Sequence, residues 1–486
     1  MKAKHLTTLV LLAMFLISGS ALAQGLTPIE ELGKALFFDA RLSTPPGQSC
    51  AACHGPEVGY TGPDQAINSG QVAYAGAVHV RGGNRKPPTA AYGGFSPVFH
   101  YDDVEELFIG GMFWDGRATG WTLGDPLAEQ AMGPFLNPLE QNSPNAKLVC
   151  LKVAHSDYAD LFESVWGPGS IDPVKDVAGM YERIALSISA YESSSEVGPF
   201  TSKYDYYLAG MAELTAEESM GLTLFNGKAQ CALCHPSEPG ADGSAPLFTD
   251  FTYDNLGLPP NYELPFYRAT RKYNVLGFDW IDLGLGGFLE TVPEYAHMAA
   301  ENYGKHKVPT LRNVDLRPFP EFVKAFGHNG YFKSLEEITN FYNTRDVDGW
   351  PAPEVGSTVN DDELGDLGLT LAEEAAVVAF MKTLSDGYIP PTAKSAPAAP
   401  VLALRFAHKP GDLASGVFNF TLARAGNIQF DVYNIRGQRV ARLATGWHDA
   451  GPYSFNLDSK ELASGMYIAR LVTDREIATR KVTLLR

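Results

Sequence analysis

Apolar residues follow a helical spacing in four segments of the first 390 residues. Positions three and four apart are apolar over 29–38 and 215–225, and again over 181–191 and 371–384, which predicts four amphipathic helices. Each helix of the first pair opens a stretch that a helix of the second pair closes. The order of helix, loop, long excursion and closing helix therefore occurs twice, and indicates an internal duplication.

The apolar period changes from helical to two beyond residue 400. Phe418, Phe420 and Leu422 alternate with polar residues, and later runs do the same between Gly, Asn and Asp positions. This pattern predicts a small antiparallel β-sandwich over 401–486. A linker rich in Pro and Ala, 389–400, precedes it. We expect no chemistry in the sandwich, because it contains no cysteine.

The composition is that of a globular protein with room for about three domains. Of the 486 residues, 45 % are apolar and 19 % are charged. Thirty-eight basic side chains against 56 acidic ones give a net charge of −18. A charge of this sign argues against nucleic acid as a partner and favours a basic one, such as an electron-donor cytochrome.

The first 23 residues have the pattern of a secretory signal peptide. Lys2 and Lys4 precede an apolar run over 9–17, and residues 21–23 read Ala-Leu-Ala, which is a small-x-small cleavage site. The apolar run is too short for a membrane anchor, which needs about 20 residues. We therefore expect an exported chain whose mature form begins near Gln24.

The candidate chemistry lies in the cysteines. Four of the five belong to two copies of the motif CxxCH, formed by Cys50, Cys53 and His54 and by Cys231, Cys234 and His235. Two thiols at this spacing can add to the two vinyl groups of one haem, and the adjacent histidine can bind its iron. We therefore predict two covalently bound haems c. The fifth cysteine, Cys150, is expected to be an ordinary buried thiol.

Three other interpretations of a CxxC pair remain. Two pairs can form a four-cysteine zinc site, but 181 residues separate them and neither pair would need a following histidine. A thioredoxin-like redox pair stands at a helix start after a strand, and no strand pattern precedes these pairs. Each pair can also close a small disulfide loop. The repeated histidine favours haem over all three.

Further short motifs follow each haem motif. After the first come Phe-Trp-Asp-Gly-Arg-Ala (113–118) and Gln-Ala-Met-Gly-Pro (130–134), and after the second come Lys-Val-Pro-Thr-Leu-Arg-Asn-Val (307–314) and His-Asn-Gly (328–330). Over about 28–388 the chain thereby resembles the bacterial dihaem cytochrome c peroxidase family, which includes the MauG-type oxidases.

The resemblance implies a mainly α fold, with two cytochrome c-like haem domains in tandem followed by the small antiparallel β-sandwich. The expected organisation is a signal peptide (1–23), an N-terminal peroxidatic domain (24–205), a C-terminal electron-transfer domain (206–388), the linker (389–400) and the sandwich (401–486).

The resemblance also implies roles for individual residues. His54 is expected to be the proximal ligand of the peroxidatic haem, and His235 that of the haem that receives electrons. Trp114 matches the family's tryptophan between the haems. Gln130 and Glu140 match the pair on the distal side of the peroxidatic iron. Peroxide reduction needs such a carboxylate, because a proton must move from one peroxide oxygen to the other.

Three positions distinguish this chain from peroxidase-type members of the family. Tyr342, fourteen residues after His328, stands where those members have Met and MauG-type oxidases have Tyr. A Tyr ligand on the second haem would lower its potential, and the alternative is a packed aromatic side chain. His79, or else His100, is the candidate loop histidine that caps the first haem. Lys86 stands where the family has an Asn that binds calcium, which puts a calcium ion in doubt.

The end of the chain resembles a second family. The segments 425–428, 432–437 and 462–467 and the basic end 478–486 resemble the C-terminal sorting domain of type IX secretion substrates. This resemblance implies transit through the periplasm, passage across the outer membrane by the type IX machinery, and a secreted or surface-attached protein. A carbohydrate-binding or spacer sandwich is the alternative.

The function best supported by these features is that of a cytochrome-c peroxidase-type oxidoreductase. It would reduce hydrogen peroxide to water with electrons from a donor cytochrome or similar redox protein. One alternative, which Tyr342 favours, is a MauG-like dihaem oxidase that acts on an organic or protein substrate. A non-catalytic electron carrier is the other, and the Gln130 and Glu140 pair argues against it. The sequence leaves a homodimer open.

The haem count is the first testable prediction. Pyridine haemochrome analysis of the exported protein should give two covalent haems c per chain, because each CxxCH motif attaches one. Cys50→Ala and Cys231→Ala should each remove one of the two. A count of one haem in the unaltered protein would contradict the duplicated architecture.

Overall fold

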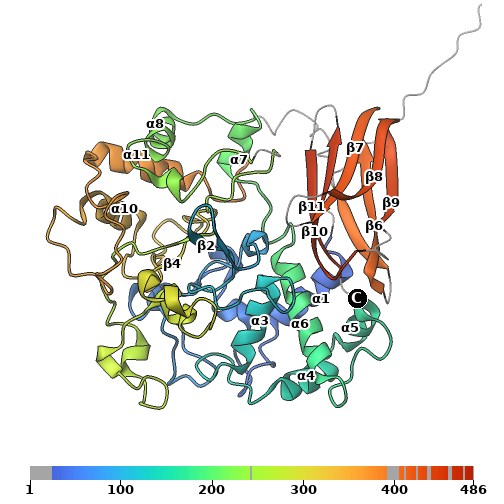
Figure 1. Cartoon of the computed structure of the whole chain (residues 1–486), viewed down its shortest axis with the longest axis horizontal. Coiled ribbons are helices and arrows are strands. Elements are labelled where there is room, and N and C mark those ends of the chain that lie inside the picture. The colour runs from blue at the N-terminus through green and yellow to red at the C-terminus, as the bar shows by residue number, and fades with distance from the viewer. Residues whose placement is uncertain are drawn as a thin grey trace, which may run out of the picture.

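The computed structural model describes residues 25–240, 243–390 and 404–484. Short turns within the last segment are left out, at 410–411, 423–424, 435–438, 458–461 and 474–476. The expected signal peptide and nearly all of the expected linker lie outside the described residues. Figure 1 shows a large body of helices and long loops, with a β-sandwich at one side.

Two pairs of crossing helices frame the body, and they correspond to the four helices predicted from the apolar spacing. α1 (Pro28–Phe38) packs against α6 (Val177–Glu192), and α8 (Ala216–Phe225) packs against α11 (Leu371–Lys382). We call the part from α1 to α6 the first unit and the part from α8 to α11 the second unit.

The two crossings are built alike, because a glycine lies at each point of closest approach. A Cβ atom placed on Gly33 of α1 would lie 1.9 Å from the carbonyl oxygen of Ser187 in α6. A Cβ atom placed on Gly221 of α8 would lie 1.9 Å from the carbonyl oxygen of Ala376 in α11. Only glycine allows the helix backbones to come this close. The duplication predicted from sequence is therefore visible in the backbone packing.

Shorter elements and long loops fill the space between the paired helices. In the first unit these are α2 (Gln65–Ser69), α3 (Pro126–Leu136), α4 (Ala146–Ala154), α5 (Ala159–Trp166) and the hairpin β1 (His100–Asp102) and β2 (Leu107–Ile109). α7 (Lys203–Leu208) connects the units, and the second unit adds α9 (Gly284–Leu289), α10 (Leu335–Thr344) and the pair β3 (Tyr253–Asp254) and β4 (His306–Lys307). Single 3₁₀ turns punctuate the loops.

Side chains of the two units pack together and form hydrogen bonds across the boundary between them. Phe99 and Phe108 of the β1–β2 hairpin pack into one apolar cluster with Leu285 and Leu289 of α9. Arg312, which is 2 % exposed, donates two hydrogen bonds to Asp205 of α7, at 2.8 and 3.0 Å. Its guanidinium also lies over aromatic rings of the first unit and of the connection. The units therefore form one continuous body.

The predicted sandwich is present and antiparallel. One sheet has the strand order β11-β10-β7-β8 and the other β5-β6-β9. Their bounds are β5 (Arg405–Lys409), β6 (Asp412–Leu422), β7 (Gly426–Asn434), β8 (Arg439–His448), β9 (Gly451–Leu457), β10 (Gly465–Thr473) and β11 (Ile477–Leu484). The alternating Phe418, Phe420 and Leu422 all face the core between the sheets, as their period of two predicts.

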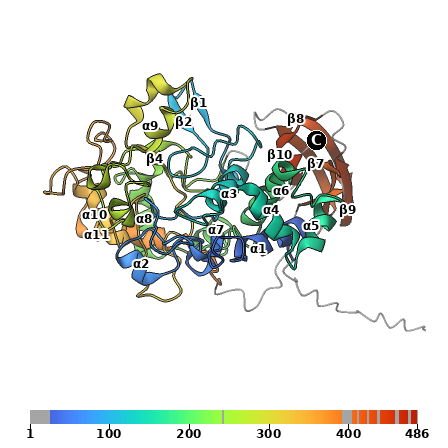
Figure 2. The ribbon, with the colours of Figure 1, turned by 90° about the horizontal axis from the view of Figure 1, so that it is seen from below.

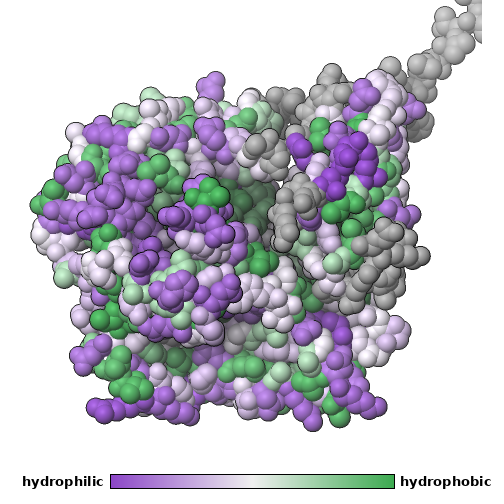
Figure 3. Space-filling view, viewed as in Figure 1, coloured by the Kyte–Doolittle hydropathy of each residue, from purple (hydrophilic) through white to green (hydrophobic). Residues whose placement is uncertain are grey.

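The sandwich lies against the first unit near α1, α5 and α6 (Figures 1 and 2). Arg480 of β11 forms an ion pair of 3.0 Å with Glu30 of α1, and the adjacent Lys481 donates a hydrogen bond of 2.5 Å to the carbonyl oxygen of Gly94. On the face drawn in Figure 3, polar and apolar residues are interspersed. Within the described residues, every helix is too short or too polar to cross a membrane.

Candidate haem sites

The second CxxCH motif opens onto a cavity in the second unit. Cys231 and Cys234 lie on and just after a 3₁₀ turn (Cys231–Leu233), and His235 follows. All three line the cavity, and Tyr342 of α10 lines it as well. The rest of its wall is largely apolar, with Leu258, Phe326, Leu335, Ile338, Val377 and Met381. This combination of two thiols, one imidazole and an apolar wall suits a covalently attached haem.

The motif histidines are held in the orientation that an axial ligand needs. Nδ1 of His235 lies 2.7 Å from the carbonyl oxygen of Phe248, and Nδ1 of His54 lies 3.1 Å from that of Tyr60. A carbonyl can only accept, so Nδ1 carries the proton and Nε2 keeps its lone pair. Burial lowers the pKa of both imidazoles, which keeps them neutral. Both rings are therefore ready to bind a metal through Nε2.

The cysteines do not fit the competing interpretations. All five are free thiols, so neither pair closes a disulfide loop. Burial raises the pKa of Cys53 and of Cys231 to about 12, so both thiols are protonated in the structure. The two motifs also pack against different core clusters, one in each unit. Cys150 is buried in α4, with its thiol 3.6 Å from a backbone carbonyl, as expected of an ordinary core thiol.

Tyr342 lines the same cavity as the second CxxCH motif. Its ring projects from α10 into the same cavity. Burial raises the pKa of Tyr342, and the thiols of Cys231 and Cys234 raise it further. The phenol is therefore close to both thiols and protonated in the absence of a metal. Tyr342 also packs against the core cluster of the second unit, so its aromatic ring contributes to packing as well.

Glu140 lies close to the first CxxCH motif. It follows the end of α3, and its Oε1 accepts a hydrogen bond of 2.9 Å from Asn137. Burial raises the pKa of Glu140, although Arg117 opposes part of this effect. The negative charge of Glu140 raises the pKa of the thiols of both Cys50 and Cys53. A carboxyl group with a raised pKa beside a haem motif is suited to taking and returning a proton.

Gln130 lies on α3, half-buried, one turn and a half before the helix ends. Among the hydrogen bonds of the described residues, none joins Gln130 to Glu140. The backbone of Glu140 is hydrogen-bonded to the loop that carries His79. The amide of Ala77 in this loop donates to the carbonyl oxygen of Glu140 at 2.7 Å. His79 is exposed on this loop. His100 is exposed on β1, whose hairpin packs against the second unit.

Trp114 connects the two units at the cavity. It is 8 % exposed and lines the cavity of the second motif. Its indole N–H donates a hydrogen bond of 2.8 Å to the carbonyl oxygen of Lys86 in the first unit. Its own carbonyl oxygen accepts from the amide of Lys307 in the second unit, at 2.8 Å. The ring is thereby fixed at the boundary between the units.

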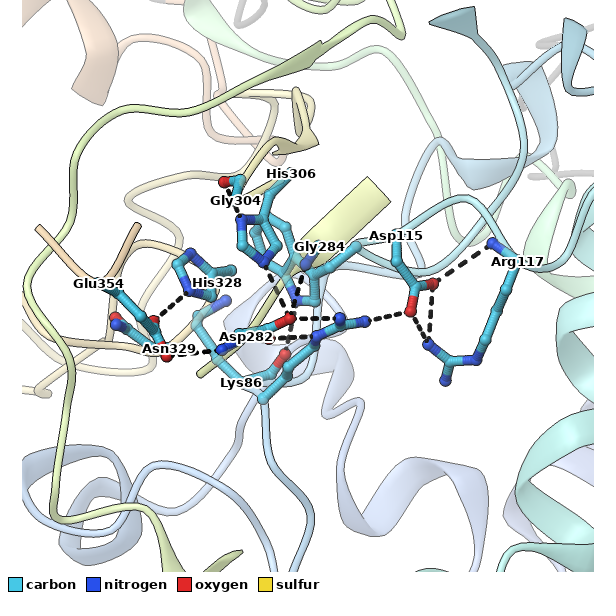
Figure 4. A network of polar contacts seen from close by, with 12 residues as sticks. Lys86, Asp115, Arg117, Asp282, Gly284, Gly304, His306, His328, Asn329 and Glu354 are labelled. Atoms are coloured by element: carbon cyan, nitrogen blue, oxygen red, sulfur yellow. Dashed lines mark hydrogen bonds and ion pairs between the residues drawn. The ribbon is translucent and has the colours of Figure 1, made fainter. Parts of the chain in front are cut away.

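A buried polar network, drawn in Figure 4, lies beside Trp114 and was not predicted as a unit from the sequence. Arg85 donates two hydrogen bonds to Asp282, at 2.6 and 2.7 Å, and one of 2.6 Å to Asp115. Burial alone would raise the pKa of Asp282, but Arg85 holds it well below the ordinary value. The imidazoles of His306 and His328 stack at 3.5 Å next to this pair. Asp115 and His328 lie in the motifs 113–118 and 328–330 noted in the sequence, whereas no sequence pattern marks Arg85, Asp282 or His306.

This network does not have the geometry of a metal site, although Asp282, His306 and His328 lie close enough together to suggest one. Two rings stacked at an angle of 6° point their nitrogen lone pairs in parallel, whereas a shared metal needs them to converge. Both oxygens of Asp282 are already occupied by Arg85. Burial lowers the pKa of His306 to about 4, so its ring is neutral. The cluster is a pair of stacked imidazole rings beside a buried ion pair.

The residues at the expected calcium position do not fit calcium. The ammonium group of Lys86 donates to Thr61 Oγ1 and to the carbonyl oxygen of Pro87, both at 3.1 Å. Burial lowers the pKa of Lys86 to about 8, so that it still carries a charge near neutral pH. A cationic side chain cannot serve as a ligand for a divalent cation, which requires oxygen donors.

Comparisons with known proteins identify the families to which the two parts of the chain are similar. Residues 28–213 match the family profile of the di-haem cytochrome c peroxidases, and residues 414–484 match that of the secretion system C-terminal sorting domain. The methylamine utilization protein MauG of Paracoccus denitrificans is 32 % identical over 393 residues, which cover 76 % of this chain and 93 % of that protein.

Two further relatives are named as peroxidases. Cytochrome-c peroxidase IdrP1 of Denitromonas iodatirespirans is 28 % identical, over 73 % of this chain and 80 % of that protein. The crystal structure of the diheme peroxidase BthA from Burkholderia thailandensis matches with a TM-score of 0.62 at 31 % identity, and covers 76 % of this chain and 90 % of that one.

The position of Tyr342 generates a prediction. Tyr342→Met should change the low-spin spectrum of the second haem and raise its potential, because a thioether favours ferrous iron more than a phenolate does. Spectroelectrochemical titration measures both. Tyr331→Met is the matched control, since Tyr331 packs against the same core cluster outside the cavity lining. An unchanged spectrum and potential in Tyr342→Met would leave Tyr342 with a packing role only.

Proposed function

Because the chain belongs to the di-haem cytochrome c peroxidase family, we propose that it carries two haems c and reduces hydrogen peroxide to water. Cys50, Cys53 and His54 would hold one haem, and the second motif the other. The observation that carries the proposal is the partly buried carboxyl of Glu140, with its raised pKa, next to the first motif. A mere electron carrier has no use for such a group.

The bound haems would supply the one-electron redox steps and an iron position open to peroxide. The side chains of the chain do the rest. Glu140 takes a proton from one peroxide oxygen and returns it to the other, which is worth about 10²–10⁴ in rate. Gln130 would hydrogen-bond the peroxide from α3, without competing for the iron. Asn137 holds the Glu140 carboxyl in place through its hydrogen bond.

The overall reaction consumes one peroxide, two protons and two electrons and yields two water molecules. We propose that the electrons come from a donor redox protein and enter at the haem of His235. Trp114 would lie on the route from the second unit to the first, since its backbone and its indole are hydrogen-bonded to opposite units. The net charge of −18 favours a basic donor.

A second function is favoured by one specific observation. Tyr342 lines the cavity of His235, and tyrosine at this position is the feature that the sequence shares with MauG-type oxidases. An anionic ligand there would stabilise a more oxidised second haem. The chain would then act as a MauG-like oxidase on an organic or protein substrate, with peroxide as the oxidant.

The peroxidase and the oxidase differ in the redox state of the protein that reacts with peroxide. Turnover of peroxide with a reduced cytochrome c as donor should be measured on the as-isolated and the half-reduced protein. Faster turnover in the half-reduced protein supports the peroxidase. Peroxide consumption that needs no prior reduction, with little donor oxidation, supports the oxidase.

Glu140→Gln is the sharpest test of the chemistry. It keeps the shape but removes the base, so turnover should fall by roughly 10²–10⁴, while both haem spectra barely change. The rate of the unaltered protein should rise with pH through the raised pKa of Glu140, because the base must be ionised before it can take a proton. That limb of the pH profile should vanish in Glu140→Gln.

Glu163→Gln on the exposed face of α5 is the matched control, since it removes a carboxylate far from either motif in the chain. Equal loss in both variants, or full turnover in Glu140→Gln, would exclude Glu140 as the base.

The C-terminal sandwich is a sorting domain, and we propose that it directs the chain across the outer membrane by the type IX route. Deletion of 401–486 should leave peroxide turnover intact but hold the protein in the periplasm, because both haem motifs lie in the body. Immunoblots of periplasm and medium measure the distribution. Arg480→Ala removes only the ion pair with Glu30 and should still be exported. Truncated protein in the medium would contradict the sorting role.

A further inference from the structure

One lysine is completely buried at the boundary between the two units. Lys324 is 4 % exposed, and its ammonium group donates three hydrogen bonds to backbone carbonyl oxygens. The acceptors are Val58 at 2.9 Å, Asn313 at 2.9 Å and Leu316 at 3.0 Å. Val58 belongs to the first unit, whereas the other two belong to the second. One positive charge is thus shared by the backbones of both units.

The three oxygens define the chemistry of the site. Carbonyl oxygens that converge from different segments are the donor set with which proteins bind hard cations. An ammonium group has three N–H donors and can satisfy all three oxygens, whereas a neutral amine has only two. Burial and the nearby charge of Lys86 lower the pKa of Lys324, and the three carbonyl dipoles favour its charged form.

The backbones of the two units come unusually close at this point. Gly59, next to Val58, has a φ of +78°, and a Cβ atom placed on it would lie 2.7 Å from Cβ of Asn313. Residue 59 must therefore be a glycine for the carbonyls of Val58 and Asn313 to face one ammonium group. The site is formed by the contact between the units and does not exist in either unit alone.

The segment that carries Lys324 makes further contacts with the first unit on both sides. Asn68 donates a hydrogen bond of 3.1 Å to the carbonyl oxygen of Val323, and Lys333 donates one of 2.9 Å to that of Asn68. The amide of Lys86 donates to the carbonyl oxygen of His328 at 2.8 Å. Lys324 lies at the buried end of these contacts between the units. It also lines the cavity that Trp114 lines.

We propose that Lys324 is a tethered cation, which fixes the two units against each other in place of a free metal ion. The covalent link to the chain keeps the ammonium group at the site, so no ion has to be captured from solution. The lysine at position 86 adds a second ammonium group nearby, which would repel a divalent ion. The presence of two haems is part of the proposed function. Their relative position would then be independent of calcium.

The first experiment uses the unaltered holoprotein. Metal analysis should find two iron atoms per chain and no stoichiometric calcium. Treatment with EGTA should leave the thermal unfolding curve and both haem potentials unchanged, and added calcium chloride should not alter them either. Stoichiometric calcium, or a loss of stability on chelation, would overturn the proposal, whatever the variants do.

The second experiment compares two lysines with the same number of bonds. Lys152 of α4 donates to the carbonyl oxygens of Leu42 and Ser43 and to Thr44 Oγ1, all within the first unit. Lys324→Met and Lys152→Met therefore each remove three hydrogen bonds, but only the first removes a link between units. Lys324→Met should split the calorimetric transition into two, whereas Lys152→Met should shift a single transition to lower temperature.

A third measurement addresses the cation directly. Lys324→Ala leaves space for an ion, whereas Lys324→Met fills it. Ammonium chloride at millimolar concentration should raise the unfolding midpoint of Lys324→Ala by about 2 °C or more and leave Lys324→Met unchanged. Calcium chloride should rescue neither variant, because the ammonium group of Lys86 remains. Tetramethylammonium chloride at equal ionic strength controls for screening, because that cation has no N–H to donate to the carbonyl oxygens.

Three results would refute the proposal in the variants: a single transition in Lys324→Met, equal behaviour of the two methionine variants, or no rescue of Lys324→Ala. If Lys324→Met does not accumulate, Lys324→Arg, which keeps the charge, should accumulate and Lys324→Gln should not. None of these readouts uses peroxide, so a failure of the peroxidase assignment leaves them interpretable, and the haem count tests that assignment separately.

Discussion

The hydrogen bonds from the motif histidines to backbone carbonyls are the constraint on which the rest of the structure depends. A free imidazole can bind iron through either nitrogen and in many orientations. His235 loses that freedom because Phe248 occupies its Nδ1 at 2.7 Å, and His54 because Tyr60 does so at 3.1 Å. Each carbonyl must itself be held in place, so the loops that follow the motifs have to be rigid. The crossed helix pairs, which approach closely at glycine, supply the rigid frame behind them.

The boundary between the units is held by charges rather than by apolar contact alone. Arg85 bridges Asp115 and Asp282, Arg312 pairs with Asp205, and Lys324 binds three carbonyls. Burying such groups costs desolvation energy, so they add little to net stability, but breaking one partner is expensive. Apolar surfaces tolerate sliding, whereas hydrogen bonds of 2.6–3.0 Å do not. These contacts therefore determine how the two units are positioned against each other around Trp114.

The parts of the fold that could be predicted are those that depend on local sequence. The four framing helices follow from apolar spacing, the sandwich from the period of two, and both histidines from CxxCH. The Arg85–Asp282 pair joins residues 197 positions apart, and the Lys324–Val58 bond spans 266 positions. No spacing rule reaches that far, and the second bond involves a backbone carbonyl, which every residue has. Glu140 and Tyr342 were found only through resemblance, since a lone carboxylate or tyrosine has no pattern of its own.

The duplicated frame separates what is constant from what can diverge. Both units have the glycine crossing and a motif histidine that donates a hydrogen bond to a carbonyl. The groups near each motif differ: an ionisable carboxyl at Glu140 in the first unit, and the phenol of Tyr342 within a largely apolar cavity in the second. A carboxyl group can move protons, and a phenol can hold an iron in its oxidised state. The two similar helix frames therefore carry chemically different groups beside their CxxCH motifs.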